Sequence, residues 1–231
     1  MSSSPIVFFD LGSKDNVPFS WRTWSIRLLL NYKRVRYHTT FAGFSALQQV
    51  LPAAGIPPTG TSDTGAPMYT VPALIDPSTG TKIAETREVA AYLEKTYPTP
   101  AIALPAADEQ PVHDALTPFR KLVVPGIVNL LEGEDERFYI DSRRKLLGKE
   151  LSEICPPGAA RDDAIAGLRA ALEQLASTFP GSPWFFGGSK PVFLDFQLIG
   201  WLLWLKLGAL PGVWDALRME ELAGGEIHGA L

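Results

Sequence analysis

The sequence predicts an α/β domain followed by an all-helical domain, and two features of its apolar pattern lead to this division. Up to residue 97, apolar runs of strand length alternate with apolar residues at helical spacing. After residue 110, only helical spacing occurs. The stretch between them, residues 98–110, is rich in proline and alanine, as interdomain linkers often are. We therefore expect one domain at residues 1–97 and a second at residues 111–231.

The α/β domain is expected to begin with a buried strand, because residues 6–9 form an apolar run that ends at Asp10. Residues 21–32 carry apolar side chains at helical spacing and predict a helix, with Ser20 in the N-cap position. Residues 37–41 are rich in β-branched and aromatic side chains and predict a second strand.

A surface loop and a hairpin are expected next. Residues 57–67 contain an excess of Gly, Pro, Ser and Thr, which predicts the loop. The hairpin strands are expected at 71–75 and 82–84, joined by the turn Asp-Pro-Ser-Thr-Gly at 76–80, because proline presets one backbone dihedral and glycine tolerates a positive φ. Residues 86–97 predict the helix that completes the domain.

The second domain is predicted to be entirely helical. Amphipathic or apolar helical patterns occur at residues 111–131, 141–151, 160–177 and 194–207. The last of these is apolar on almost every side, which predicts a central buried helix. It ends before Gly208 and is too short to cross a membrane.

The composition argues against several kinds of function. Lys and Arg total 21 against 25 Asp and Glu, giving a formal net charge of −4 with no evident basic face, so nucleic-acid binding is not expected. The histidines and the single cysteine lack metal-ligand spacing, so no metal site is expected. The sequence contains no GxGxxG or GxxxxGK[ST] loop. Cys155 cannot form an intrachain disulfide and no signal peptide is evident, so a cytoplasmic location is expected.

Two segments of the first domain carry a family resemblance. Tyr-Thr-Val-Pro-Ala-Leu at 69–74 and Ile-Ala-Glu-Thr-Arg-Glu-Val-Ala-Ala-Tyr-Leu at 83–93, in this order of elements, resemble the soluble glutathione transferases. Phe-Ser-Trp-Arg-Thr-Trp-Ser-Ile-Arg at 19–27, followed by Leu-Asn-Tyr-Lys at 30–33, is similar to the serine-type fungal-specific class FuA, which is related to the bacterial glutathione-dependent β-etherases. Residues 55–59 and 76–80 are similar to the same class.

The resemblance implies a thioredoxin-like N-terminal domain that binds glutathione as a co-substrate and a helical C-terminal domain that contributes a hydrophobic substrate site. It also implies a homodimer with a role in detoxification, which is consistent with the cytoplasmic location and the lack of metal, nucleic-acid and membrane partners expected from the composition. Two positions depart from the family pattern. Thr86 follows the acidic Glu85 where serine is common, which keeps a hydroxyl, and Val192 replaces the Ser or Thr that usually stands three residues before Asp195 as a helix cap.

Ser20 is the candidate catalytic residue. A glutathione transferase must hold the thiol as a thiolate, because the thiolate is the nucleophile and a free thiol is mostly protonated at neutral pH. The resemblance implies that the Ser20 hydroxyl donates to the glutathione sulfur beside the start of the first helix. A plain N-cap serine is the alternative, and Ser25 and Ser13 are the nearest rival hydroxyls. Cys155 lies in the other domain, which argues against thiol–disulfide chemistry.

Four further residues are implied as glutathione ligands. A cis bond between Val71 and Pro72 would present the Val71 backbone to the cysteinyl part, while Glu85 and Thr86 would bind the amine and the carboxylate of the γ-glutamyl part. Without the resemblance, Pro72 would be an ordinary edge-strand proline and Glu85-Thr86 a good helix start. The glycyl carboxylate is left without an assigned partner. Its candidates are Gln48, Gln49 and Lys82.

The hydrophobic substrate site is expected between the domains, walled by the first helix and by the helix that begins near Pro111. Phe119, Val123 and Ile127 recur there at helical spacing, although core packing explains them equally well. The predicted reaction is attack of the glutathione thiolate on hydrophobic, aromatic electrophiles. Glutathione-dependent β-aryl-ether cleavage, peroxide reduction and non-catalytic binding of aromatic compounds are left as alternatives.

Overall fold

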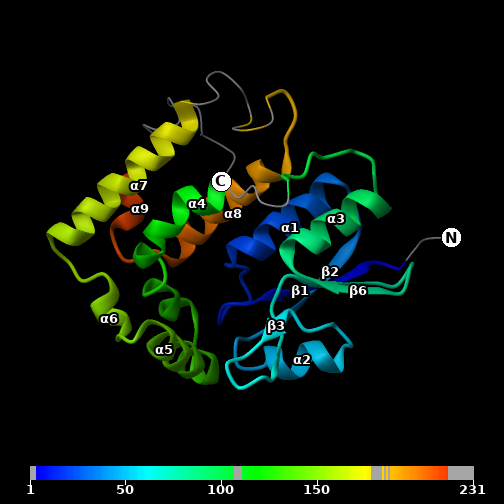
Figure 1. Ribbon diagram of the computed structural model, residues 1–231, viewed down its shortest axis with the longest axis horizontal. Coiled ribbons are helices and arrows are strands. Elements are labelled where there is room, and N and C mark those ends of the chain that lie inside the picture. The colour runs from blue at the N-terminus through cyan, green and yellow to red at the C-terminus, as the bar shows by residue number, and fades with distance from the viewer. Residues whose placement is uncertain (1–3, 107–110, 178–183, 185, 187, 218–231) are drawn as a thin grey trace.

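In the computed structural model, the described residues (4–106, 111–177, 184, 186 and 188–217) form an α/β domain beside a helical domain (Figure 1). The elements of the α/β domain are β1 (Ile6–Leu11), α1 (Trp21–Tyr32), β2 (Tyr37–Ala42), α2 (Leu47–Ala53), β3 (Gly60–Thr61), β4 (Pro67–Met68), β5 (Ala73–Asp76), β6 (Thr81–Ala84) and α3 (Thr86–Thr96). The elements of the helical domain are α4 (Pro111–Leu116), the 3₁₀ helices η1 (Thr117–Leu122) and η2 (Gly126–Leu130), α5 (Gly133–Leu147), α6 (Leu151–Ile154), α7 (Ala159–Ser177), α8 (Phe193–Gly208) and α9 (Val213–Leu217).

The main sheet of the first domain has the strand order β2-β1-β5-β6. β2 is parallel to β1, with Phe8 opposite Thr39, whereas β5 and β6 are antiparallel to their neighbours. Figure 1 shows α1 and α3 on one face of this sheet and α2 on the other. This mixed sheet between helices confirms the predicted thioredoxin-like arrangement, followed by the predicted helical domain.

Residues 6–9 of β1 are all apolar because both faces of the sheet are covered. Side chains alternate between the faces of a strand, so Phe8 and Phe9 point in opposite directions. Phe8 is fully buried in a cluster with Ile26 of α1 and Leu93 of α3, and Phe9 packs in a separate cluster with Leu51 of α2. The continuous apolar run in the sequence is therefore the signature of a strand that lies between two layers.

α2 and the β3–β4 hairpin lie where the sequence predicts no regular structure. α2 is only seven residues long, contains Pro52 and buries only Leu47 and Leu51, so its apolar period is too short to be recognised. β3 and β4 form a two-residue ladder at the predicted loop 57–67.

The predicted continuous helix over residues 111–131 is wrong. α4 ends at Leu116, and η1 and η2 follow it as separate 3₁₀ helices. Pro118 stands in the first turn of η1, and Pro125 precedes η2. Proline has no N–H to donate and clashes with the preceding turn, so each of these residues interrupts an α-helix.

The predicted helix over residues 141–151 also needs correction, because α5 begins eight residues earlier, at Gly133, and ends at Leu147. Glu134, Asp135 and Glu136 stand in its first turn, where acidic side chains favour a helix start. Gly148 follows with φ +66°, a left-handed conformation that ends helices and favours glycine. In contrast, α7 and α8 lie at the predicted positions.

α8 is the central helix of the second domain and also its main contact with the first. Gly200 of α8 lies against α1, where an added Cβ atom would come within 2.5 Å of the carbonyl oxygen of Trp21. The ring of Trp21 lies 5.3 Å from that of Trp201, centroid to centroid.

The start of α8 retains half of a capping box, because Asp195 accepts a hydrogen bond of 2.8 Å from the Val192 N–H although the valine side chain can accept none. None of the helices in the described ranges has both the length and the hydrophobicity needed to cross a membrane.

A second interdomain contact is polar. Asp135 Oδ1 on α5 accepts hydrogen bonds from the Ser45 N–H at 2.8 Å and from Ser45 Oγ at 2.6 Å. The Lys14 N–H donates to the Leu130 carbonyl at 2.8 Å nearby. Gly43 packs so tightly against the Asp135 carboxylate that an added Cβ would overlap it. The domains therefore touch along α1 and α8 and again at this polar contact.

We expect Asp135→Ala to lower the free energy of unfolding by about 1–3 kcal/mol, because it removes two hydrogen bonds to a charged acceptor. Urea denaturation measures this loss. Glu134→Ala is the matched control, because Glu134 is an exposed acid in the same helical turn without the interdomain bonds. An equal loss in both variants would contradict the prediction and assign the effect to the start of the helix alone.

Candidate active site

Ser20 ends the loop between β1 and α1 and occupies the N-cap position of α1, with φ −70° and ψ 125°. Its carbonyl accepts hydrogen bonds from the Trp24 N–H at 2.9 Å and from Thr23 Oγ1 at 3.0 Å. Its own side chain makes no capping hydrogen bond, and within the described part of the chain Ser20 Oγ has no other partner. This half-buried hydroxyl is therefore free to donate to a ligand beside the start of α1.

The hydroxyl groups of the two alternative serines, Ser25 and Ser13, already make hydrogen bonds within the protein. Ser25 is fully buried inside α1 and donates to the Arg22 carbonyl at 2.7 Å. Ser13 Oγ accepts hydrogen bonds from the Asp15 and Val17 N–H groups, at 3.2 and 3.1 Å, and so shapes its own loop. Only Ser20 combines a free hydroxyl with a position at the start of α1.

The Val71–Pro72 peptide bond is cis, as the resemblance implied. Pro72 contributes its carbonyl to the Glu85 N–H at 3.2 Å, which links the strand β5 to the start of α3. No hydrogen bond joins the N–H or C=O of Val71 to another described residue. Val71 thus leaves a short stretch of main chain open to pair with an extended ligand.

Glu85 and Thr86 form the start of α3. Glu85 has φ +76°, an unfavourable conformation for a residue with a side chain, and its Oε1 accepts a hydrogen bond from Thr70 Oγ1 at 3.2 Å. Thr86 is 6% exposed, and its buried Oγ1 has no hydrogen-bond partner. A buried hydroxyl without a partner is unusual in proteins. Together with the N–H groups in the first turn of α3, which have no carbonyl partner within the helix itself, it makes this helix start a candidate site for a carboxylate.

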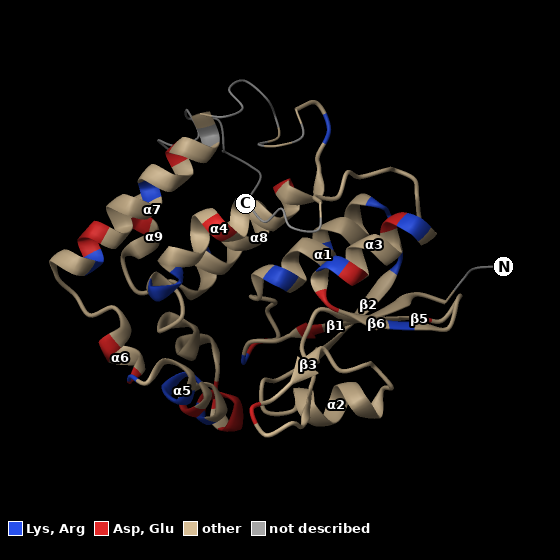
Figure 2. Ribbon diagram, in the orientation of Figure 1, with Lys and Arg blue, Asp and Glu red and all other residues tan. Residues whose placement is uncertain are grey.

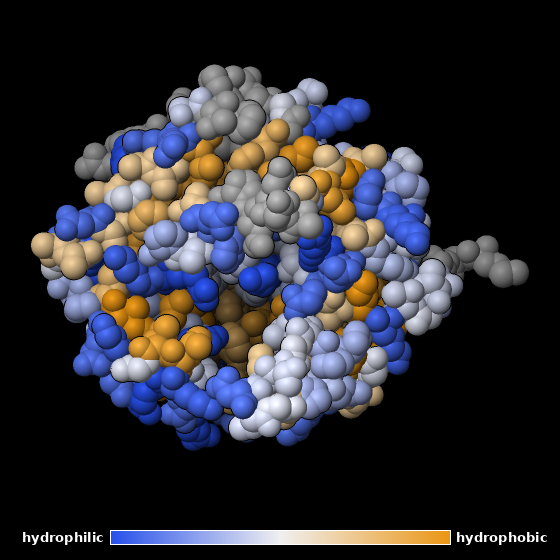
Figure 3. Space-filling view, in the orientation of Figure 1, coloured by the Kyte–Doolittle hydropathy of each residue, from blue (hydrophilic) through white to orange (hydrophobic). Residues whose placement is uncertain are grey.

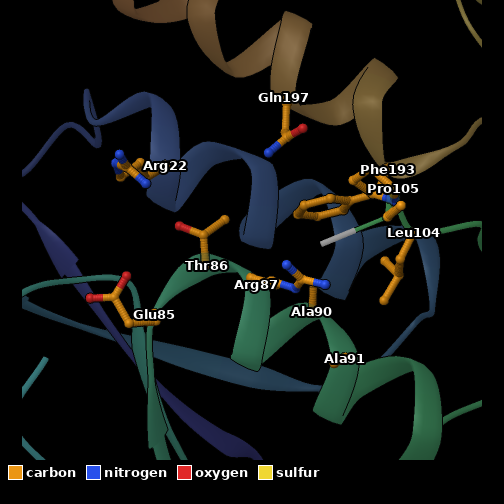
Figure 4. A pocket seen from close by; sticks show the side chains of 11 residues that line it. Arg22, Glu85, Thr86, Arg87, Ala90, Ala91, Leu104, Pro105, Phe193 and Gln197 are labelled. Atoms are coloured by element: carbon orange, nitrogen blue, oxygen red, sulfur yellow. The ribbon is translucent and has the colours of Figure 1, made fainter. Parts of the chain in front are cut away.

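A cavity of about 320 Å³ lies over this helix start. Figure 4 shows Arg22 of α1 at one end of it, Glu85 and Thr86 below, and Gln197 extending into it from α8 above. Its other lining residues are Arg87, Ala90, Ala91, Leu104, Pro105, Ala106 and Phe193. Burial lowers the pKa of the Arg22 guanidinium, and the Glu85 carboxylate opposes this shift. The cavity therefore offers a carboxylate, a cation and a buried hydroxyl to a ligand end that carries both charges.

Matches with known proteins fall on both domains. The family profile described as "Glutathione S-transferase, N-terminal domain" matches residues 18–96, and "Glutathione S-transferase, C-terminal domain" matches residues 103–229, more than half of the chain. The chain belongs to the glutathione S-transferase family.

Three fungal proteins are among those similar to this chain. It is 28% identical over 226 residues to the "Glutathione S-transferase-like protein ustS" of Aspergillus flavus, a match that covers 87% of this chain and 80% of the relative. The crystal structure of GSTFuA3 from Phanerochaete chrysosporium is similar with a TM-score of 0.81 and 27% identity, covering 97% of this chain and 93% of that one. The structure of CsGST83044 from Ceriporiopsis subvermispora, in complex with glutathione, has a TM-score of 0.83 and 28% identity, with 97% and 95% covered. The expected similarity to the FuA class is confirmed.

The candidate hydrophobic residues of this chain lie away from the cavity. Val123 and Ile127 are 1% and 2% exposed and pack against Gly208 of α8, and Phe119 is half-buried beside Gly167 of α7. The gap beside Phe119 and Val123 measures only about 10 Å³. Val123 and Ile127 therefore belong to the interior of the helical domain, Phe119 is partly exposed, and none of the three lines the cavity over α3.

The three candidates for a glycyl carboxylate have different surroundings. Gln48 exchanges hydrogen bonds with the backbone of Tyr69, donating at 2.8 Å and accepting at 3.0 Å. Lys82 Nζ donates to the Ala54 carbonyl at 2.8 Å, and Gln49 is exposed on α2. Two of the three are therefore occupied in holding α2 against its neighbours.

Several residues at the cavity were not identified from the sequence. Gln197 and Phe193 come from α8, and Leu104 comes from the segment after α3. The packing of α8 on α1 brings the two α8 residues to the cavity. No local pattern marks such residues, because their role depends on the tertiary contact. Among the residues that the structure describes, no cluster of three or more His, Cys, Asp or Glu side chains could hold a metal ion.

Proposed function

We propose that this chain is a glutathione transferase that joins the glutathione thiol to hydrophobic, aromatic electrophiles, with Ser20 as the donor that stabilises the thiolate. The observation that carries the proposal is the start of α3, where the Glu85 carboxylate stands beside the buried and unpartnered Thr86 hydroxyl. The solved relative that contains glutathione supports the same ligand.

The residues present fit the chemistry of glutathione. Its γ-glutamyl end carries an ammonium, which Glu85 can bind, and a carboxylate, which Thr86 and the first N–H groups of α3 can bind. The open N–H and C=O of Val71 suit the peptide part of the same molecule, which would add to the sheet edge as an extended strand. Each polar group of the site therefore has a matching group on the ligand.

Ser20 would act on the sulfur. Bound glutathione supplies a thiolate that attacks an electrophilic carbon. The Ser20 hydroxyl would donate a hydrogen bond that favours the charged form of the thiol, and the N–H dipoles of α1 would add to this effect. Lowering a thiol pKa by two units takes about 2.7 kcal/mol, which such a donor at a helix start can supply.

The proposal assigns to each domain the role that the sequence predicted. Residues 1–97 would bind glutathione, residues 98–110 would connect the domains, and residues 111–231 would contribute to the electrophile site. A cytoplasmic homodimer with a detoxifying role completes the proposal, as the resemblance implies.

Calorimetric titration with glutathione and with cysteinylglycine tests the proposal. Both ligands carry the same thiol, but cysteinylglycine lacks the γ-glutamyl end that Glu85 and Thr86 would hold. We expect glutathione to bind and cysteinylglycine to bind at least about tenfold more weakly, because a charge-assisted hydrogen bond contributes about 1.5–3 kcal/mol. Equal affinities, or no binding of glutathione, would overturn the assignment of this site.

A further inference from the structure

The two domains meet on both sides of a hollow in the face that Figure 3 shows, with hydrophobic residues at the floor of the hollow. On one side α1 and α8 pack together, and the cavity over α3 lies beside this contact. Figure 4 shows Gln197 reaching from α8 toward the start of α3, on the side of the cavity opposite Thr86. Both domains therefore contribute polar groups to the cavity.

Gln197 is an exception on an otherwise apolar helix. α8 carries charge only at Asp195 and Lys206, near its two ends, so the middle of the helix is uncharged (Figure 2). Asp195 accepts two backbone hydrogen bonds at the helix start, at 2.8 and 2.9 Å, and Lys206 is exposed to solvent. Gln197 is half-buried, and its side-chain amide has no hydrogen-bond partner among the described residues. A polar group withdrawn from water costs free energy unless it finds a partner, so this amide is available to a ligand.

Two contacts hold α8 in place on either side of Gln197. Before it, the Phe193 N–H donates to the Ala103 carbonyl at 3.0 Å. After it, Gly200 lies so close to α1 that an added Cβ would come within 2.5 Å of the Trp21 carbonyl oxygen. The backbone of Gln197 is therefore held beside the cavity, and only its side-chain torsions need to be ordered when a ligand binds.

The amide of Gln197 matches a group of glutathione that the start of α3 contacts from one side only. A carboxylate can accept about four hydrogen bonds, two at each oxygen. Under the proposed function, Thr86 and the first N–H groups of α3 approach the γ-glutamyl carboxylate from below. The Gln197 amide offers two N–H donors from the opposite side, and it brings no charge that would compete with Glu85 for the ammonium.

We propose that Gln197 donates a hydrogen bond to the γ-glutamyl carboxylate, so that the helical domain takes part in binding glutathione. This role rests on the proposed function, because glutathione must occupy the start of α3. The ligand would then connect α3 of the first domain to α8 of the second, beside the contact between α1 and α8.

Calorimetry with glutathione and with 4-aminobutyryl-cysteinylglycine tests this contact, because the second ligand lacks only the γ-glutamyl carboxylate. Gln197→Leu should bind glutathione about tenfold more weakly than the wild type does, since a hydrogen bond to a charged group is lost. The same variant should bind the analogue with unchanged affinity. Gln197→Glu keeps nearly the same shape but carries a negative charge, and it should bind glutathione more weakly still, because two carboxylates repel each other.

Two controls separate this effect from damage to the fold. Lys206→Leu also replaces a polar side chain of α8 by leucine, but Lys206 is exposed and does not line the cavity, so both affinities should stay as in the wild type. Urea denaturation without ligand should show no loss of stability in Gln197→Leu, because the amide has no partner among the described residues to lose.

An equal loss of affinity for the two ligands in Gln197→Leu would contradict the proposal and assign Gln197 a packing role. An unchanged affinity for glutathione in this variant would contradict it as well, while a wild-type preference for glutathione over the analogue would leave the site at α3 in place. If the wild type binds both ligands equally, the γ-glutamyl carboxylate is not recognised, and the assignment of the α3 start fails together with the role of Gln197. The wild-type comparison thus distinguishes failure of the glutathione site from failure of the Gln197 contact.

Discussion

Ser20→Ala is expected to raise the pKa of the bound glutathione thiol by about one to two units and to lower kcat/KM at neutral pH roughly 10- to 100-fold. The Ser20 hydroxyl makes no capping hydrogen bond in the protein, so its removal leaves the first turn of α1 intact. A hydrogen bond to a charged group contributes about 1.5–3 kcal/mol, which corresponds to this change in pKa and rate.

The raised pKa of the thiol determines how the rate of the variant depends on pH. Removing the donor raises the thiol pKa, so the variant holds less thiolate than the wild type at every pH below its own new value. We expect the difference in rate to be largest near neutral pH and to narrow as the pH rises above about 9, where both proteins hold a thiolate. Titration of thiolate absorbance in the complex, together with kcat/KM at several pH values, measures both effects.

Ser13→Ala serves as the control for Ser20→Ala. It removes a hydroxyl from the same loop, but one that already accepts backbone hydrogen bonds, and we expect no change in the thiol pKa. Ser20→Thr keeps a hydroxyl and should retain much of the activity. An unchanged thiol pKa in Ser20→Ala would identify a different donor and would leave Ser20 as a plain N-cap residue.

The local part of this site could be predicted from the sequence because short-range signals specify it. The N-cap position of Ser20, the helix after it and the hairpin before Glu85 each depend on residues close in the chain. The helix boundaries of the helical domain were predicted less accurately. Pro118 and Pro125 interrupt a pattern that is otherwise periodic, and the acidic first turn of α5 lies before the apolar residues of that helix. Apolar spacing alone overestimates helix length where proline intervenes.

The cleft could not be predicted, because it depends on how two domains pack. Gly200 allows α8 to approach the Trp21 carbonyl, and this close approach carries Gln197 to the cavity over α3. Helical spacing marked Phe119, Val123 and Ile127 for burial without showing whether they face a core or a cleft.

Thr86→Val is expected to change stability and glutathione affinity in opposite directions. In the free protein, Thr86 Oγ1 is buried without a hydrogen-bond partner, which costs about 1–3 kcal/mol. Valine has nearly the same shape and no polar group, so the variant should unfold at a higher urea concentration than the wild type. Glutathione should bind roughly 10- to 100-fold more weakly, because its γ-glutamyl carboxylate would lose a charge-assisted donor.

These opposite signs distinguish a ligand-binding hydroxyl from a structural one. A structural hydroxyl would lower stability when removed, and affinity would fall only as a consequence of the damaged fold. Urea denaturation without ligand and calorimetry with glutathione separate the two cases, and Thr86→Ser restores the hydroxyl and should restore the affinity. A variant that is stabilised but binds glutathione as the wild type does would show that the carboxylate lies elsewhere. The start of α3 would then offer a donor without an acceptor, and the Arg22 guanidinium at the other end of the same cavity would be the next group to test.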